Sequence, residues 1–243
     1  MGWVHVHKFP LTLLAAYLAV WGFLAIEPLS RSDWILENLL VALTLPLLII
    51  FHRRLQISRA SDVLLFVFYT LHAVGGHWSY SNVPFIPWEE MGFQRNHFDR
   101  IVHFGFGLLL WLPLRNAIKQ FTKLGATGSG VFALSVIWAL SGLYEVIEWG
   151  AVAVVSPELG QEFLGAQGDE FDASKDMALA MGGALLAFAL ERIVQAVRRR
   201  ATTPVQATVR TIPGAATSAK VGHASSGAKP VQVATKPDGE RRR

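Results

Sequence analysis

The chain has no cysteine and few charged residues. None of its 243 residues is cysteine, which excludes disulfide bonds, thiolate metal ligands and cysteine nucleophiles. Asp, Glu, Lys and Arg make up only 16% of the chain and hydrophobic residues 52%, whereas soluble domains carry about 25% charged residues. The mean hydropathy is +0.36. This composition is typical of a membrane protein.

Six apolar stretches have about the length that a helix needs to cross a bilayer, which is roughly 20 residues. They cover Phe9–Ile26, Trp34–Phe51, Ala60–Gly76, Asp99–Ile118, Gly130–Val155 and Asp172–Ala196. We therefore predict an all-α, polytopic membrane bundle of about six transmembrane helices. No small-x-small cleavage site follows the first stretch before Glu27 and Pro28, so we expect that stretch to be retained as a span.

Basic residues in the short loops predict the orientation. Lys8, Arg53, Arg54, Arg59, Arg115, Lys119, Lys123, Arg192 and Arg198–Arg200 would lie on one side, and only Arg31, Arg95, Arg100 and Lys175 on the other. The positive-inside rule makes the first side cytoplasmic. We therefore expect both termini to lie in the cytoplasm.

The composition of the last residues differs from that of the rest of the chain. We therefore predict a six-span domain over residues 1–197 and a disordered basic cytoplasmic tail over 198–243. The tail carries ten basic and two acidic residues and has no apolar period, so burial cannot offset its ordering entropy. It is either a partner for anionic lipid head groups or a solvated extension. Its charges have no aromatic residues among them, which argues against nucleic-acid binding.

Acidic and histidine side chains occur at helical spacing near the outer ends of the predicted spans. Asp99 and His103 are four residues apart, and Glu145 and Glu148 are three apart, so each pair lies on one helix face. Ionisable groups in hydrocarbon are costly unless they face the bundle interior. We therefore predict one outward-facing polar pocket between the third to sixth spans.

The sixth span adds a third acidic pattern. Asp169, Asp172 and Asp176 form one stripe, provided that the helix begins before Asp172. The predicted pocket residues are His97, Asp99, His103, Glu145, Glu148, Asp169, Asp172 and Asp176, with His72, His77, Arg100 and Lys175 as secondary members. Small residues in the same spans, among them Gly107, Gly183 and the pair Ala178-x-x-x-Gly182, predict close helix packing.

Three interpretations of this pocket remain open. Carboxylates and imidazoles on facing helices are typical ligands of zinc, manganese or iron, so a divalent metal ion is one candidate cofactor. The same groups also mark proton or ion relays. In the structural interpretation, Arg100 neutralises Glu145 or Glu148, Lys175 neutralises a neighbouring acid, and His103 connects helices through hydrogen bonds.

Three motifs resemble the YjdF family of bacterial inner-membrane proteins. They are Asn96-His-Phe-Asp-Arg-Ile-Val-His-Phe104, Tyr144-Glu-Val-Ile-Glu-Trp149, and Gly165–Asp172 followed by Asp176-Met177. The resemblance covers roughly Pro10 to Arg192 and implies a multi-span protein of unassigned biochemical function. The segment Asp99–Phe104 is also similar to the Asp-Lys-x-x-His-Phe motif of VanZ-like membrane proteins, with Arg100 in place of Lys, which implies a link to the cell envelope.

The function predicted from these observations is that of a multi-pass inner-membrane protein with an outward-facing acidic and histidine pocket. In the first hypothesis the pocket is the divalent-metal site of an enzyme acting on an envelope or lipid-linked substrate. In the second, the protein binds or transports a cationic or proton-coupled ligand. In the third, it is a structural membrane protein without catalytic activity. The oligomeric state is left open.

Overall fold

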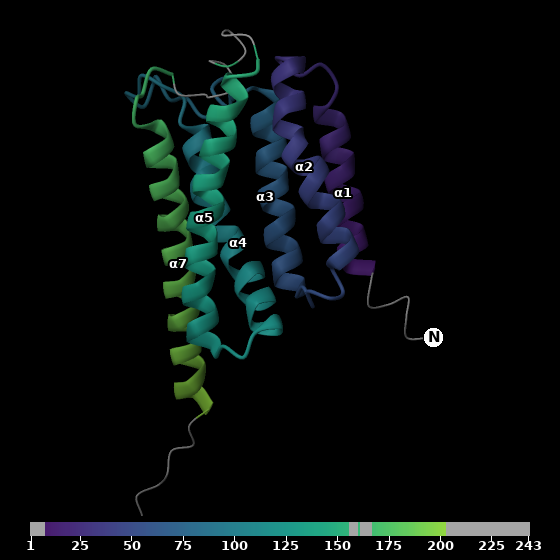
Figure 1. Cartoon of the computed structure of the whole chain (residues 1–243), viewed down its shortest axis with the longest axis vertical. Helices are drawn as coiled ribbons and strands as arrows, with labels where there is room; N and C mark the ends of the chain where they lie inside the picture. The colour runs from purple at the N-terminus through teal and green to yellow at the C-terminus, as the bar shows by residue number, and fades with distance from the viewer. Residues whose placement is uncertain (1–7, 156–159, 161–166, 203–243) are drawn as a thin grey trace, which may run out of the picture. The chain divides into compact units, whose positions relative to one another are not determined.

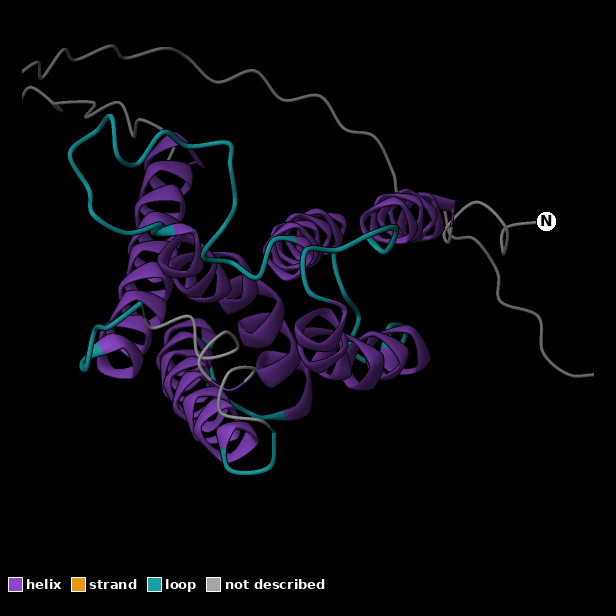
Figure 2. Ribbon diagram, turned by 90° about the horizontal axis from the view of Figure 1, so that it is seen from above, coloured by secondary structure: helices purple, strands orange, loops and turns teal. Residues whose placement is uncertain are grey.

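The computed structural model describes residues 8–155, 160 and 167–202, and these form six helices (Figure 1). They are α1 (Lys8–Leu24), α2 (Arg31–Phe51), α3 (Arg59–His77), α4 (Phe98–Phe121), α5 (Ala126–Val152) and α7 (Asp172–Thr202). The described residues contain no strand (Figure 2). The prediction of an all-α fold is therefore confirmed.

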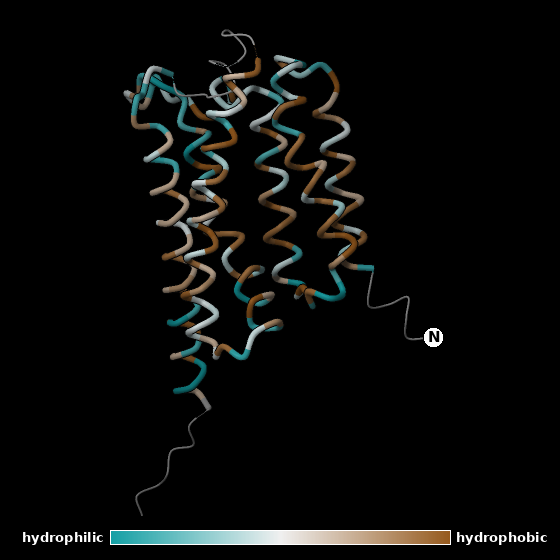
Figure 3. Tube along the Cα trace, viewed as in Figure 1, coloured by the Kyte–Doolittle hydropathy of each residue, from teal (hydrophilic) through white to brown (hydrophobic). Residues whose placement is uncertain are grey.

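Four of these helices, α2, α4, α5 and α7, are long and apolar enough to cross a membrane. Helix α1 is apolar but shorter, at 17 residues. Many large apolar side chains, such as Phe23, Leu39 and Trp149, are exposed on the helix surfaces. Hydrophilic residues gather at the two ends of the bundle, with hydrophobic ones between them (Figure 3). These are the surfaces of a helical membrane bundle.

Consecutive helices run in opposite directions, so α1 begins at the same end of the bundle at which α7 finishes (Figure 1). We call this the basic end, because Arg53, Arg115 and Arg192 lie there. The opposite end holds the start of α4 and of α7 with Asp99 and Asp176, and we call it the acidic end.

Helix α7 continues beyond the predicted boundary between membrane domain and tail. It reaches Thr202, whereas the span was predicted to stop at Ala196 and the tail to begin at residue 198. Alanine and arginine favour helix, and Arg199 and Arg200 in the last turn also interact favourably with the helix dipole. The rest of the predicted tail, from residue 203 onward, lies outside the described residues.

Close packing of α4 against α7 holds the site helices together. A methyl group added at Gly107 would overlap the carbonyl oxygen of Ala180, and one at Gly183 would overlap that of Phe104. Gly182, by contrast, has no atom within 4 Å of such a methyl group. The predicted close packing is therefore present, but Gly183 makes the contact and Gly182, the end of the predicted small-residue pair, does not.

Candidate functional site

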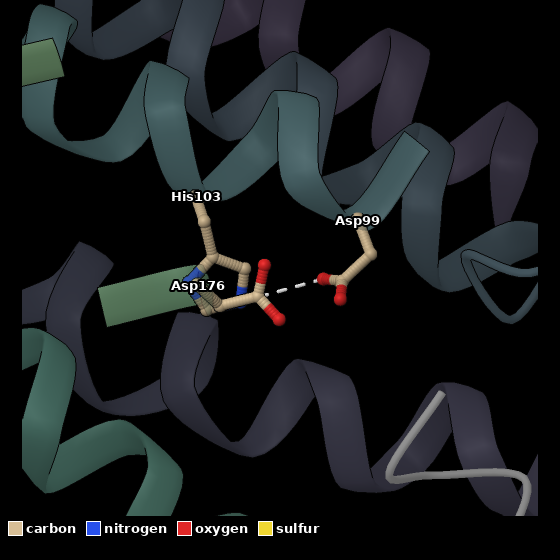
Figure 4. A group of neighbouring side chains, drawn as sticks. All are labelled: Asp99, His103 and Asp176. Atoms are coloured by element: carbon tan, nitrogen blue, oxygen red, sulfur yellow. Dashed lines mark ion pairs between the residues drawn. The ribbon is translucent and has the colours of Figure 1, made fainter. Parts of the chain in front are cut away.

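Three side chains at the acidic end converge from α4 and α7. Asp99, His103 and Asp176 each offer one ligand atom, and these atoms all lie within 4.8 Å of one another. His103 Nε2 is 3.4 Å from Asp99 Oδ1 (Figure 4). Asp99 and His103 share a face because they are one helical turn apart on α4, and α7 brings Asp176 against that face. We call these three residues the central cluster.

Two carboxylate oxygens in and beside the central cluster are buried without a hydrogen-bond partner among the described residues. Glu145 Oε1 on α5 lies 3.8 Å from His103 Nδ1, within ion-pair range. Neither this oxygen nor Asp176 Oδ1 has a hydrogen-bond partner among the described residues, and Asp176 is only 2% exposed. Buried polar atoms usually have a hydrogen-bond partner, so these two oxygens remain available as acceptors.

Asp169 and Asp172 do not join the central cluster. Arg95 Nη1 lies 2.7 Å from Asp172 Oδ1, Arg100 Nη2 lies 2.5 Å from Asp169 Oδ2, and Lys175 Nζ lies 2.6 Å from the same oxygen. Helix α7 begins only at Asp172, so Asp169 lies in the preceding turn and the predicted stripe of three acids does not form. Arg100 therefore pairs with these acids, and the predicted pairing with Glu145 or Glu148 is absent from the described contacts.

Further hydrogen bonds connect the segment that precedes α4, at Asn96, with the segment that precedes α7, at Gln167. Gln167 Oε1 accepts from the Asn96 backbone N–H at 3.1 Å, and Gln167 Nε2 donates to the Asn96 carbonyl at 2.9 Å. The Asn96 side chain accepts from the Phe98 N–H at 3.0 Å, which satisfies one of the free N–H groups at the start of α4. Asn96, Gln167 and the ion pairs of Asp169 and Asp172 thus form a clasp that positions the starts of α4 and α7.

Acid should weaken this clasp. The hydrogen bond from Lys175, with those from Phe171 N–H and Arg100, lowers the pKa of Asp169 from 3.8 to about 2. A lowered carboxyl pKa contributes stability that is present above pH 3.8 and lost as the pH falls toward 2. We expect Asp169→Asn to lower the melting temperature at pH 5 to 7, and the difference from wild type to shrink between pH 3.8 and 2. Melting curves across this range test the prediction, with exposed Glu170→Gln as the control; a difference that does not change with pH would contradict it.

The other predicted histidines have structural contacts. His77 Nδ1 donates to the Leu24 carbonyl at 2.7 Å, connecting α3 to α1. His72 Nε2 faces the Glu37 carbonyl at 3.2 Å, and its Nδ1 faces the Tyr80 hydroxyl at 2.5 Å. Because a carbonyl oxygen only accepts, Nε2 carries a hydrogen and both ring nitrogens are in use. His72 and His77 therefore lie outside the central cluster.

His97 also lies apart from the central cluster. Arg100 Nη1 donates to its Nδ1 at 3.2 Å, and its ring packs edge-on against Phe93 with centroids 5.0 Å apart. Burial, followed by the nearby charges of Arg100 and Arg95, lowers the pKa of His97. Its neutral form is therefore favoured, and its ring contacts Arg100, one of the residues of the clasp.

Helix α2 contributes one acid that the pocket prediction missed, Glu37, and carries a second buried acid, Asp33, beside it. Glu37 is buried and accepts a hydrogen bond from the Tyr144 hydroxyl at 3.3 Å, and Asp33, also buried, precedes it by one turn. Their spacing of four residues was the available signal, the same one that indicated Asp99 and His103. The polar pocket thus draws on five helices, from α2 to α5 and α7.

The fold and site define a helical membrane protein with a buried carboxylate and histidine cluster at one end of its bundle. The chain belongs to the family of predicted membrane proteins DUF2238, which matches residues 9–196. It is 32% identical over 182 residues to Inner membrane protein YjdF of Escherichia coli (strain K12), covering 72% of this chain and 87% of that protein. The predicted resemblance to the YjdF family is confirmed. No solved structure matches the chain.

Proposed function

We propose that the central cluster binds a divalent metal ion and that the ion serves an enzyme acting on an envelope or lipid-linked substrate. The observation that supports the site is the convergence of Asp99, His103 and Asp176 within 4.8 Å, together with the unpartnered oxygen of buried Asp176. Ligands of a tetrahedral zinc ion, each about 2.1 Å from it, lie about 3.4 Å apart. The most distant pair of ligand atoms, within 4.8 Å of each other, would therefore close by about 1 Å on binding.

The position of Glu145 supports a metal bound to His103 Nε2. A histidine that binds a metal through one ring nitrogen usually donates the other N–H to a carboxylate, which fixes the ring orientation. Nε2 faces Asp99, and Nδ1 faces Glu145 at 3.8 Å. Glu145 is thus the candidate orienting residue.

Charge also favours a bound cation. Glu37 and Glu148 lie in the pocket beside the three carboxylates at His103, while Arg95, Arg100 and Lys175 pair with Asp169 and Asp172. Carboxylates this close in a poorly hydrated interior repel one another and must either be protonated or share a cation. A divalent ion would offset two of the negative charges.

The donor set suits metal-assisted hydrolysis or group transfer. A divalent ion held by carboxylates and one imidazole polarises a substrate oxygen or lowers the pKa of a bound water. Glu148 lines the same pocket as Asp99 and His103 and is the candidate general base. The site would lie on the outer side of the inner membrane, because the basic end, with Lys8, Arg53 and Arg115, is cytoplasmic by the positive-inside rule.

The geometry favours this function over ion transport. The buried ionisable groups at the basic end are paired, with Arg115 Nη2 2.9 Å from Glu191 Oε1 and His52 Nε2 2.7 Å from Asp62 Oδ1. Between these pairs and the pocket, α2, α3, α4, α5 and α7 carry no Asp, Glu, His, Lys or Arg. The sequence thus offers no chain of charged groups for a relay across the membrane. A tail that contacts anionic lipids remains a proposal for residues outside those described.

Metal-dependent stability tests the proposed site. We expect EDTA to lower the melting temperature of the purified protein and one of Zn²⁺, Mn²⁺ or Fe²⁺ to restore it, because a ligand at 100 times its Kd stabilises the folded state by about 2.7 kcal/mol. His103→Gln should remove this response, while Glu89→Gln, an exposed loop acid, should keep it. Identical melting with EDTA and with every cation would show that the proposed ion is not bound.

A further inference from the structure

A single cavity connects the central cluster to the apolar interior of the bundle. It has a volume of about 480 Å³ and lies between α2, α3, α4 and α5. Asp99, His103 and Glu148 line it toward the acidic end, and apolar residues including Phe51 and Leu114 line it toward the basic end. A molecule that fits this cavity therefore meets carboxylates at one end and hydrocarbon along the rest.

The cavity opens toward the bilayer between α2 and α5. Leu47 on α2 and Leu140 and Ile147 on α5 line it and are also 45%, 40% and 49% exposed. No Cα atom of α2 comes within 8 Å of one in α5. The hydrogen bond from Tyr144 to Glu37 bridges the two helices near the acidic end. Between this hydrogen bond and the basic end, the opening lies on the lipid-facing surface of the bundle.

The dimensions suit one long hydrocarbon chain. The volume of about 480 Å³ lies within the roughly 300–1,000 Å³ range of small-molecule sites. Along α2 the lining runs from Glu37 to Phe51, which is about 21 Å at 1.5 Å per residue. One leaflet of hydrocarbon is only about 15 Å deep. An occupant that fills the cavity therefore extends past the bilayer midplane.

One polar group in the wall provides an independent sign of a ligand. Ser141 on α5 is 2% exposed and lines the cavity, and its hydroxyl has no hydrogen-bond partner among the described residues. It lies one turn from Glu145, on the side toward the basic end. A buried hydroxyl normally has a partner, so a polar atom of an occupant just below its head group would satisfy it.

We propose that the cavity holds the chain of a long-chain amphiphile with an oxygen-rich anionic head such as a phosphate, which enters sideways from the bilayer between α2 and α5. This inference rests on the proposed metal site, because an anionic head needs a cation to approach Asp99 and Asp176. Chain burial gains little here, since a bilayer lipid is already in hydrocarbon. The selectivity therefore comes from the head at the central cluster and from the shape of the cavity.

Photolabelling in a bilayer tests this proposal. The protein is placed in phosphatidylcholine nanodiscs with a small fraction of hexadecyl phosphate that carries a diazirine at the far end of its chain. We expect labelled residues to concentrate at the basic end of the cavity, around Phe51 and Leu114. Ile147→Trp should reduce this labelling at least tenfold by filling the opening. Val146→Trp is the matched control, because Val146 is equally lipid-facing on α5 but does not line the cavity.

Two results would overturn the proposal. One is labelling spread evenly around the lipid-facing helix surfaces, and the other is equal labelling in Ile147→Trp and Val146→Trp. Unlabelled hexadecyl phosphate should compete, whereas hexadecanol, which has the same chain without the anionic head, should not. Metal content is measured on the same samples: metal-loaded protein without cavity labelling contradicts only the substrate class, and protein without metal contradicts the metal site.

Discussion

Asp176→Asn is expected to weaken metal binding more than 100-fold while leaving the metal-free protein at least as stable as wild type. Loss of a residue that only orients a metal ligand lowers metal affinity about 10- to 100-fold. Asp176 is proposed as a ligand itself, so its loss should lower the affinity further. Without metal, its carboxylate is buried beside that of Asp99, so removing its charge relieves repulsion. Chelator competition gives the affinity, and melting in EDTA gives the stability.

The sign of the stability change separates the metal site from a structural role. If Asp176 only connected helices through hydrogen bonds, Asp176→Asn would destabilise the protein equally with and without metal. Glu89→Gln is the control, because it removes one negative charge from an exposed loop. A variant that is less stable in EDTA and unchanged in metal affinity would contradict the proposed role.

Gly183→Ala is expected to lower the free energy of unfolding by about 1–3 kcal/mol or more. Overpacking usually costs this much, and here the added methyl group meets backbone atoms, which cannot move aside as a side chain can. It would overlap the Phe104 carbonyl oxygen and force α4 and α7 apart. Gly182→Ala is the matched control, since nothing lies within 4 Å of its methyl group. That variant should stay near wild type or gain slightly in helix propensity. Melting of both purified variants checks the prediction, and equal melting temperatures would contradict the packing of α4 on α7.

The helices could be predicted from the sequence because each apolar stretch has the length of a membrane span. The paired residues could be predicted because their spacing along one helix places them on the same face. Asp99 with His103 needed nothing more than this. The rotation of α7 about its axis could not be derived in the same way. Gly182 and Gly183 differ by about 100° around the helix, and only the packing against Phe104 distinguishes them.

The membership of the pocket depended on contacts between distant parts of the chain. Asp169 and Asp176 are both acids near the same helix start, yet Arg100 and Lys175 pair with the first, and His103 lies beside the second. Sequence spacing carries no information about which base reaches which acid across 69 residues. The spacing of Glu37 and Asp33 was visible in the sequence, but the hydrogen bond that joins Glu37 to Tyr144 spans 107 residues and was not.

X-ray absorption at the edge of the bound metal tests the central claim most directly. For wild-type protein purified without chelator, we expect one ion per chain with one imidazole nitrogen and carboxylate oxygens at about 2.0–2.2 Å. The imidazole scattering should disappear in His103→Gln and persist in Glu89→Gln. Protein that carries no stoichiometric metal, or an ion surrounded by oxygen alone in the wild type, would contradict a metal site at Asp99, His103 and Asp176.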